Sequence, residues 1–144
     1  MNSAIARARK IYIDANIVIY FLEGDSEHQD KTAALFRHAE EHDIPLLTSE
    51  ITIAECLYGA YKAGKVELVE QYRTLFHAVG LFQLIPVEGS IAERAAKIGA
   101  DRRLKLIDAL HVTSALGVGC DVFVTNDRGI KSMDGLRVVQ MFEA

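Results

Sequence analysis

The sequence predicts an α/β fold, a three-layer sandwich in which helices flank a central, mostly parallel sheet of about five short strands. Short runs rich in Val, Ile, Leu and aromatic residues alternate with longer segments whose apolar residues recur at helical spacing. The short runs are apolar almost throughout, as is typical of strands buried on both faces of a parallel sheet. No repeat or Gly/Pro-rich linker divides the 144 residues, so we expect a single domain over residues 1–144.

The first half of the chain is predicted to form two strands and four helices. Its first strand is a β-branched and aromatic run that ends in an acid. The helix after it ends before Gly24, and Ser49 is a suitable N-cap for a later one. In order, the predicted elements are a strand at Lys10–Asp14, helices at Ile17–Leu22 and His28–His42, a strand at Leu46–Thr48, and helices at Glu50–Tyr61 and Lys65–His77.

The second half is predicted to form three strands and two helices. Ser90 and Glu93 have the spacing of a capping box at the start of the first helix, and Gly117 follows the second. In order, we expect a strand at Leu81–Val87, helices at Ser90–Arg103 and Ile107–Leu116, a strand at Asp121–Thr125, a turn at Asn126–Gly129 and a strand at Leu136–Gln140. In a sheet of this kind ligands bind beyond the carboxyl ends of the strands, where the loops meet.

The bulk properties of the chain restrict its function. A formal net charge of −4 argues against a protein that coats nucleic acid by bulk electrostatics, but not against one that grips phosphate through bound cations. Cys56 and Cys120 match no zinc or redox spacing and are expected to be buried thiols. The apolar stretch Ile11–Leu22 is interrupted by Asp14 and Asn16 and no cleavage site follows it, so we expect a cytoplasmic protein without membrane contacts.

Four acids fall at positions that would converge on one edge of such a sheet: Asp14, Glu55, Asp108 and Asp127. Taken singly, Asp14 suits a helix N-cap and Asp127 a polar turn. Glu55 suits a solvated helix flank, and Asp108 benefits from the dipole at a helix N-terminus. Taken together, four carboxylates on one edge would repel one another unless a cation lay between them.

These residue types favour divalent-metal chemistry on a phosphodiester. No cysteine accompanies the acids. His111 lies one turn after Asp108, and we interpret it as a core or flank histidine in preference to a metal ligand or a proton carrier. Ligation by oxygen alone favours Mg²⁺ or Mn²⁺ over zinc, with one or two ions bound. Such ions activate a water and stabilise the leaving oxygen of a phosphodiester. The residues themselves therefore predict a metal-dependent phosphodiesterase.

Basic residues precede the third acid and follow the fourth. Residues 93–105 contain more positive than negative side chains, and the segment leads directly into Asp108. A solvated helix face is an equally good explanation of this charge; the alternative is a patch that attracts nucleic acid. On the second interpretation, the residues expected to bind substrate are Arg102, Arg103, Lys105 and Arg128.

Other functions are compatible with parts of the pattern. A haloacid-dehalogenase-like, metal-dependent small-molecule phosphatase also begins with a strand that ends in Asp, but it normally has a second Asp where this chain has Asn16. A receiver-like phosphoacceptor needs an acidic pair on its first strand and a lysine after its last, and Lys131 fits that place poorly. A catalytically weak nuclease fold used as a binding module is the third alternative, since a fold alone does not establish activity.

Four short motifs together resemble the pattern of PIN domains. They are Ile11-Tyr-Ile-Asp14-Ala-Asn16, Ser49-Glu-Ile-Thr-Ile-Ala-Glu55 followed by Tyr58-Gly59, Asp108-Ala-Leu-His111, and Val124-Thr-Asn-Asp127. Each motif is short and degenerate, but their order and spacing cover essentially the whole chain. In these respects the chain is most similar to the VapC-type toxins of bacterial type II toxin–antitoxin pairs.

The resemblance implies both a site and a biological role. It places Asp14, Glu55, Asp108 and Asp127 at the metal-binding, catalytic positions, with supporting polar residues at Asn16, Ser49, Thr125 and Asn126. It implies a PIN-like fold, Mg²⁺ or Mn²⁺ as cofactor, and endoribonucleolytic hydrolysis of single-stranded RNA. It also implies a homodimer that is neutralised by a cognate VapB-like antitoxin.

Overall fold

A five-stranded sheet with every strand parallel forms the centre of the protein. The computed structural model describes residues 2–142. The strand order is β3-β2-β1-β4-β5, and the strands are β1 (Ile11–Ile13), β2 (Leu46–Ser49), β3 (Gln83–Ile85), β4 (Val122–Thr125) and β5 (Arg137–Gln140). The predicted α/β class with a parallel sheet of about five strands is confirmed.

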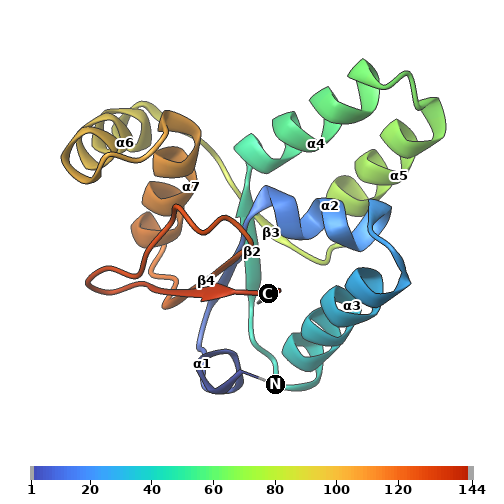
Figure 1. Cartoon of the computed structure of the whole chain (residues 1–144), viewed down its shortest axis with the longest axis horizontal. Coiled ribbons are helices and arrows are strands. Elements are labelled where there is room, and N and C mark those ends of the chain that lie inside the picture. Colours follow the sequence, from blue (N-terminus) through green and yellow to red (C-terminus); the bar gives the residue numbers. More distant parts are fainter. Residues whose placement is uncertain (1, 143–144) are drawn as a thin grey trace.

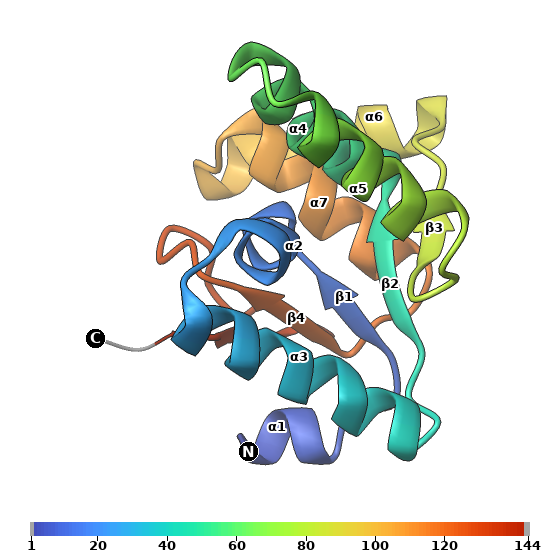
Figure 2. The ribbon, with the colours of Figure 1, turned by 90° about the vertical axis from the view of Figure 1, so that its right-hand side faces the viewer.

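Helices cover both faces of this sheet and produce three layers (Figures 1 and 2). Helices α1 to α5 pack into a core on one face, α7 packs into a second core on the other face, and α6 packs against α7. The helices are α1 (Ser3–Ala6), α2 (Ala15–Glu23), α3 (Ser26–Glu41), α4 (Glu50–Lys62), α5 (Val66–His77), α6 (Gly89–Arg102) and α7 (Leu106–Gly117).

Strand β1 shows why the sequence requires two cores. Its three residues are all buried, but successive side chains point to opposite faces of the sheet. Ile11 and Ile13 therefore belong to the core under α2 and α3, whereas Tyr12 belongs to the core under α7. The ring of Tyr12 stacks on Phe123 of the neighbouring strand, with centroids 5.0 Å apart.

The strand order places a topological switch point beside β1. The chain runs outward from β1 to β2 and β3, then returns to the other side of β1 to form β4 and β5. In open parallel sheets the connections on the two sides of such a point leave in opposite directions and open a crevice at the carboxyl ends. Asp14 follows β1 and Asp127 follows β4, so the first and last of the four acids lie beside this crevice.

Several local features differ from the prediction. Helix α1 was not expected, and β3 is shorter than Leu81–Val87. The Ser90 capping box is wrong: α6 begins one residue earlier at Gly89, so Ser90 lies inside the helix and Glu88 takes the cap position without a side-chain hydrogen bond. Ser49 is the N-cap of α4, as predicted.

Two further sequence-based expectations concern burial and membranes. Cys56 and Cys120 are both buried and unpaired, as expected. Within residues 2–142, no helix combines the length and the apolar character needed to cross a lipid bilayer.

The contact between α6 and α7 can be tested with two helical glycines. A Cβ on Gly99 would lie 3.1 Å from the Cβ of Ala109, whereas a Cβ on Gly59 would meet nothing within 4 Å. We expect Gly99→Val to lower the free energy of unfolding by about 1–3 kcal/mol, because the added methyl groups push α6 from α7. Gly59→Val should change it by less than about 0.5 kcal/mol. Urea unfolding measures both, and equal effects of the two variants would contradict this account of the interface.

Candidate active site

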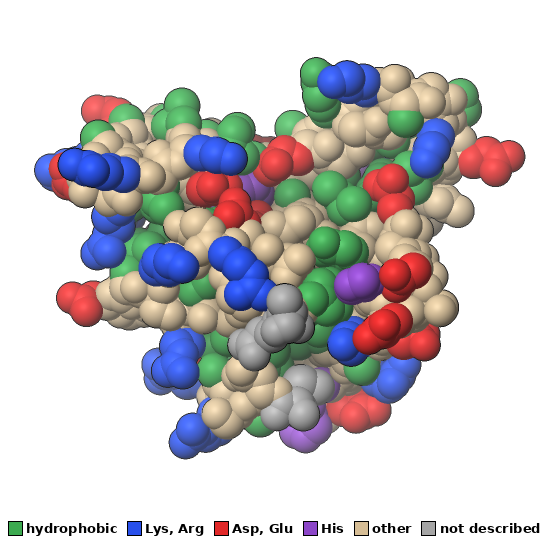
Figure 3. Space-filling model, in the orientation of Figure 1, with side chains coloured by type: hydrophobic (Ala, Val, Ile, Leu, Met, Phe, Trp, Pro, Cys, Tyr) green, Lys and Arg blue, Asp and Glu red, His purple; other side chains and the backbone are tan. Residues whose placement is uncertain are grey.

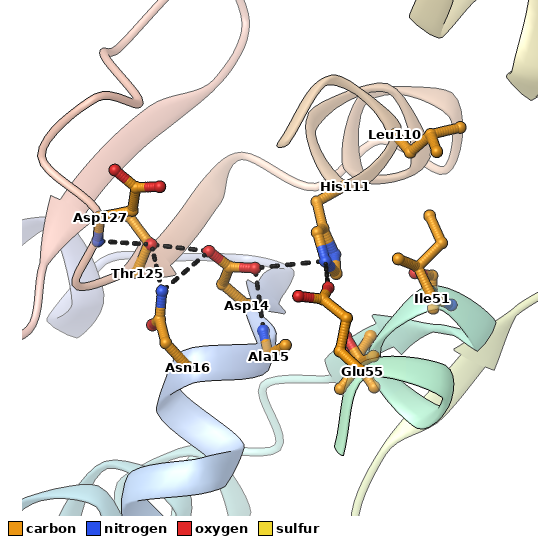
Figure 4. A network of polar contacts seen from close by, with 12 residues as sticks. Asp14, Ala15, Asn16, Ile51, Glu55, Leu110, His111, Thr125 and Asp127 are labelled. Atoms are coloured by element: carbon orange, nitrogen blue, oxygen red, sulfur yellow. Dashed lines mark hydrogen bonds and ion pairs between the residues drawn. The ribbon is translucent and has the colours of Figure 1, made fainter. Parts of the chain in front are cut away.

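Asp14 is the most buried of the four acids, with 4% of its surface exposed. It directly follows β1 and is the N-cap of α2, where its Oδ1 accepts a hydrogen bond of 2.8 Å from the backbone N–H of Ala15. Its Oδ2 accepts one of 2.7 Å from Thr125 Oγ1 and one of 3.2 Å from Asn16 Nδ2 (Figure 4). The carboxylate of Asp14 therefore both caps a helix and lies in the candidate site. Burial raises the pKa of Asp14, although the charge of His111 partly opposes this.

Three polar residues join the end of β4 to the start of α2. Asn16 Nδ2 lies 3.2 Å from Thr125 Oγ1, and Asn16 Oδ1 accepts from the backbone N–H of Asn126 at 3.0 Å. Thr125 Oγ1 also accepts from the backbone N–H of Asp127 at 3.0 Å. These contacts fix the turn that carries Asp127 relative to Asp14. The three residues expected to support the site from this side lie together.

Glu55 reaches the same region from α4 through a histidine. The side chain of Glu55 is 37% exposed, and its Oε1 lies 2.5 Å from Nε2 of His111, a residue that is 1% exposed. The same Nε2 is 3.5 Å from Oδ1 of Asp14, so His111 lies between the two carboxylates (Figure 4). Glu55 therefore turns inward. The interpretation of His111 as an ordinary core histidine missed this bridge, although its position one turn after Asp108 was a signal.

The environment of His111 contains opposing influences on its charge. Burial lowers its pKa, but the hydrogen bond to Glu55 and the negative charges of Asp14 and Glu55 raise it. The charges outweigh burial, and the net pKa of His111 is raised. The imidazolium form therefore offsets part of the negative charge in the site.

Asp108 and Asp127 form the other half of the acidic group. Asp108 lies in the first turn of α7 and is partly buried. Its pKa is raised to about 6, chiefly by burial and then by the negative charges of Asp127 and Asp14. Asp127 Oδ1 accepts from the backbone N–H of Gly129 at 2.8 Å, and Figure 4 shows its carboxylate directed away from Asp14. The fourth acid is thus near Asp108 but not turned toward the first acid.

Ser49 supports the site indirectly. It is fully buried, and its Oγ accepts from the backbone N–H of Ile51 at 3.3 Å, which caps α4. The same Oγ accepts a hydrogen bond of 2.9 Å from the hydroxyl of Tyr12. That hydroxyl lies 2.6 Å from Nδ1 of His111. Ser49 therefore reaches the carboxylates only through other side chains.

The donor chemistry of this site fits a hard divalent cation. Within residues 2–142, no group of three or more His, Cys, Asp or Glu side chains is arranged so that it could hold a metal ion as it stands. Burial and then the negative charges of Asp127 and Asp14 nevertheless raise the pKa of Asp108, and a cation would relieve the repulsion among these charges. Carboxylate oxygens suit Mg²⁺ or Mn²⁺, whereas the imidazole that zinc would prefer is committed to Glu55 and Asp14.

Acidic side chains gather in a hollow of the surface that has basic side chains near it (Figure 3). Figure 3 shows acidic side chains gathered where the surface is hollowed between the α6–α7 side and the α4–α5 side, with Lys and Arg on the α6–α7 side. Arg102 is the last residue of α6, Arg103 and Lys105 belong to the turn before α7, and Arg128 follows Asp127. All four are exposed, and none forms an ion pair with another side chain of residues 2–142.

Comparisons with known proteins agree on the architecture. The family model described as PIN domain matches residues 11–136. No curated protein sequence matches the chain. Among solved structures, VapBC2 from Rickettsia felis bound to a promoter DNA fragment has a TM-score of 0.73 at 18% identity, over 90% of this chain and 97% of that one. A toxin–antitoxin complex from Klebsiella pneumoniae gives a TM-score of 0.68 at 26% identity, over 93% and 99% of the two chains. DNA-bound VapBC from Salmonella typhimurium gives 0.67 at 20% identity, over 92% and 98%.

The burial and negative surroundings that raise the pKa of Asp108 have a measurable effect on stability in the absence of metal. Because the folded state raises the pKa of Asp108 to about 6, ionisation of this carboxyl weakens folding as the pH rises through that value. In EDTA, we expect Asp108→Asn to be more stable than the wild type near pH 8. The two proteins should approach equal stability at about pH 2.5, where the carboxyl is protonated in both the folded and the unfolded chain.

Urea unfolding at the two pH values measures this difference, and an exposed aspartate provides the control. Asp101 is exposed and pairs with Lys97 at 3.0 Å, so Asp101→Asn should give no gain at either pH. If Asp108→Asn were not stabilising near pH 8, the raised pKa described for Asp108 would be wrong.

Proposed function

This chain belongs to the PIN domain family, and we propose that it is a metal-dependent endoribonuclease that hydrolyses single-stranded RNA. The observation that carries the proposal is the arrangement of acids from four elements beside the switch point of a parallel sheet. Asp14 lies at its centre, almost fully buried and fixed by Thr125 and Asn16. Burial of a carboxylate is costly even when hydrogen-bond donors offset part of the cost, and such buried acids are typical of functional sites.

Each side chain then has a defined part. Asp14, Glu55, Asp108 and Asp127 would hold one or two Mg²⁺ or Mn²⁺ ions. When bound, such ions lower the pKa of a water and neutralise charge on the phosphodiester. Thr125, Asn16 and Asn126 orient the carboxylate of Asp14 and the turn of Asp127. Arg102, Arg103, Lys105 and Arg128 would bind the phosphates on either side of the cleaved bond.

The biological role is proposed from the relatives. The structures from Rickettsia felis, Klebsiella pneumoniae and Salmonella typhimurium are described as VapBC or toxin–antitoxin complexes. We infer that this chain is the VapC-type toxin of such a pair, that it acts in the cytoplasm as a homodimer, and that a VapB-like antitoxin neutralises it. The acids alone do not separate RNA from DNA as substrate; that choice follows the family.

The nuclease proposal is tested by incubating the purified protein with labelled RNA and DNA in Mg²⁺, Mn²⁺ or EDTA. We expect single-stranded RNA to be cut only when the metal is present. Asp14→Asn should lose at least about 100-fold in rate, because it removes the central carboxylate while keeping the size of the side chain. Asp30→Asn, an exposed acid of α3, should cut at the wild-type rate.

Three outcomes would each contradict the proposal in a different way. Cleavage that persists in EDTA would show that the reaction does not depend on a metal ion. Release of phosphate from a small phosphoester with nucleic acid left intact would identify a phosphatase. Metal-dependent cleavage without growth arrest when the chain is produced alone in bacteria would leave a nuclease but exclude the toxin.

The basic residues are tested through the salt dependence of the same reaction. We expect the double variant Arg102→Gln and Lys105→Gln to raise KM about 3–10-fold without changing kcat, because these side chains lie outside the acidic group. The dependence of log affinity on log salt concentration should become shallower by about 0.7 for each phosphate contact that is lost. Arg73→Gln, on the exposed side of α5, is the matched control; an equal effect there would remove the assignment of this patch.

A further inference from the structure

A series of hydrogen-bonding contacts through the buried side chains of Tyr12 and His111 links Ser49 to Glu55. Ser49 Oγ and the hydroxyl of Tyr12 are 2.9 Å apart, and that hydroxyl is 2.6 Å from Nδ1 of His111. Nε2 of His111 is in turn 2.5 Å from Oε1 of Glu55. Because Ser49 is the N-cap of α4 and Glu55 lies within α4, the chain of contacts begins and ends on the same helix.

The orientation of the Glu55 side chain depends on this series of contacts. Its side chain is 37% exposed and has several rotatable bonds, so water is available to it in other rotamers. Within the described residues, the hydrogen bond to His111 is the only one that the side chain of Glu55 makes. Asp14 is different, because Ala15, Asn16 and Thr125 fix it without His111. Loss of His111 would therefore release Glu55 before it affected Asp14.

The ring of His111 is itself held from the other side. Tyr12 touches it edge to face, with ring centroids 5.8 Å apart and planes at 70°. Tyr12 cannot turn away, because its ring stacks on Phe123 at 5.0 Å and its residue is fully buried. A buried hydroxyl that meets both a serine and an imidazole nitrogen is fully used, so its position is specified on both sides.

We propose that His111 is a positioning residue that holds the carboxylate of Glu55 beside Asp14, and that Tyr12 and Ser49 set the orientation of its ring. This inference rests on the proposed function, because it assigns Glu55 to the metal-binding group. Groups that orient a metal ligand typically change metal affinity or activity by about 10–100-fold when removed. A merely structural hydrogen bond would change stability alone.

The test compares two buried tyrosines whose hydroxyls can be removed without a change in ring size. Tyr12→Phe removes only the contact to His111 and Ser49. Tyr72→Phe is the matched control, since Tyr72 is fully buried and its hydroxyl donates to a carboxylate, Glu23, outside the chain of contacts. Both variants should lose a similar amount of stability in urea unfolding.

Calorimetric titration of the metal-free proteins with Mn²⁺ then distinguishes a positioning role from a merely structural one. We expect Tyr12→Phe to bind Mn²⁺ about tenfold more weakly than the wild type, and Tyr72→Phe to bind it equally well. His111→Leu should lose at least as much affinity as Tyr12→Phe. His111→Gln, whose amide can still donate to Glu55, should recover part of it. Wild-type affinity in both Tyr12→Phe and His111→Leu would overturn the proposal.

A measurement without metal keeps this test separate from the nuclease proposal. In ¹⁵N-histidine-labelled, metal-free protein, the Nε2–H of His111 should exchange slowly with water. Its exchange should be faster in Glu55→Ala and in Tyr12→Phe but unchanged in Tyr72→Phe. If the wild type failed to bind Mn²⁺ while these exchange rates behaved as expected, the nuclease proposal would fail and the positioning of Glu55 would stand. Exchange rates that are the same in all variants would contradict the proposal that His111 positions Glu55.

Discussion

The burial of one carboxyl group, that of Asp14, determines how several elements must meet. A buried carboxylate is tolerated only where hydrogen-bond donors or positive charge replace water. The donors come from the start of α2, from the end of β4 and from α7. For these elements to reach one carboxylate, β4 must lie beside β1 and α7 must cross the sheet close to the carboxyl end of β1. The sheet order and the position of the helix thus follow from the same requirement.

The acidic group divides into two halves with different electrostatics. Asp14 and Glu55 are compensated by protein donors and by His111, whereas Asp108 has a pKa raised by its burial and by the negative charges of Asp127 and Asp14. On the proposed function, the first half is organised without an ion, and the second half would provide the negative charge that attracts one. An arrangement of this kind favours ion binding at the expense of folding stability, a common compromise in functional sites.

The sequence predicts features that depend on local patterns and fails where distant contacts decide. Strand β1 and the cap at Ser49 were predictable because alternation, burial and capping act within a few residues. The predicted start of α6 was wrong because several residues near Ser90 can begin a helix, and local chemistry does not select one of them. The inward turn of Glu55 depends on His111, 56 residues away, and no periodicity carries that information. The resemblance to PIN domains is confirmed by the family model, and the parallel sheet by the structure.

The long separation between β1 and β4 has a consequence for synthesis of the chain. Thr125 follows Asp14 by 111 residues, yet the two share a hydrogen bond at the centre of the site. The strand that comes first, β1, is also the middle strand of the sheet, and it gains its second neighbour only after β2 and β3 have formed. Pairing across such a separation is slow, because loop-closure entropy is lost before the contacts form. A growing chain on the ribosome therefore holds Asp14 without Thr125 or His111, and the acidic group assembles only late in translation.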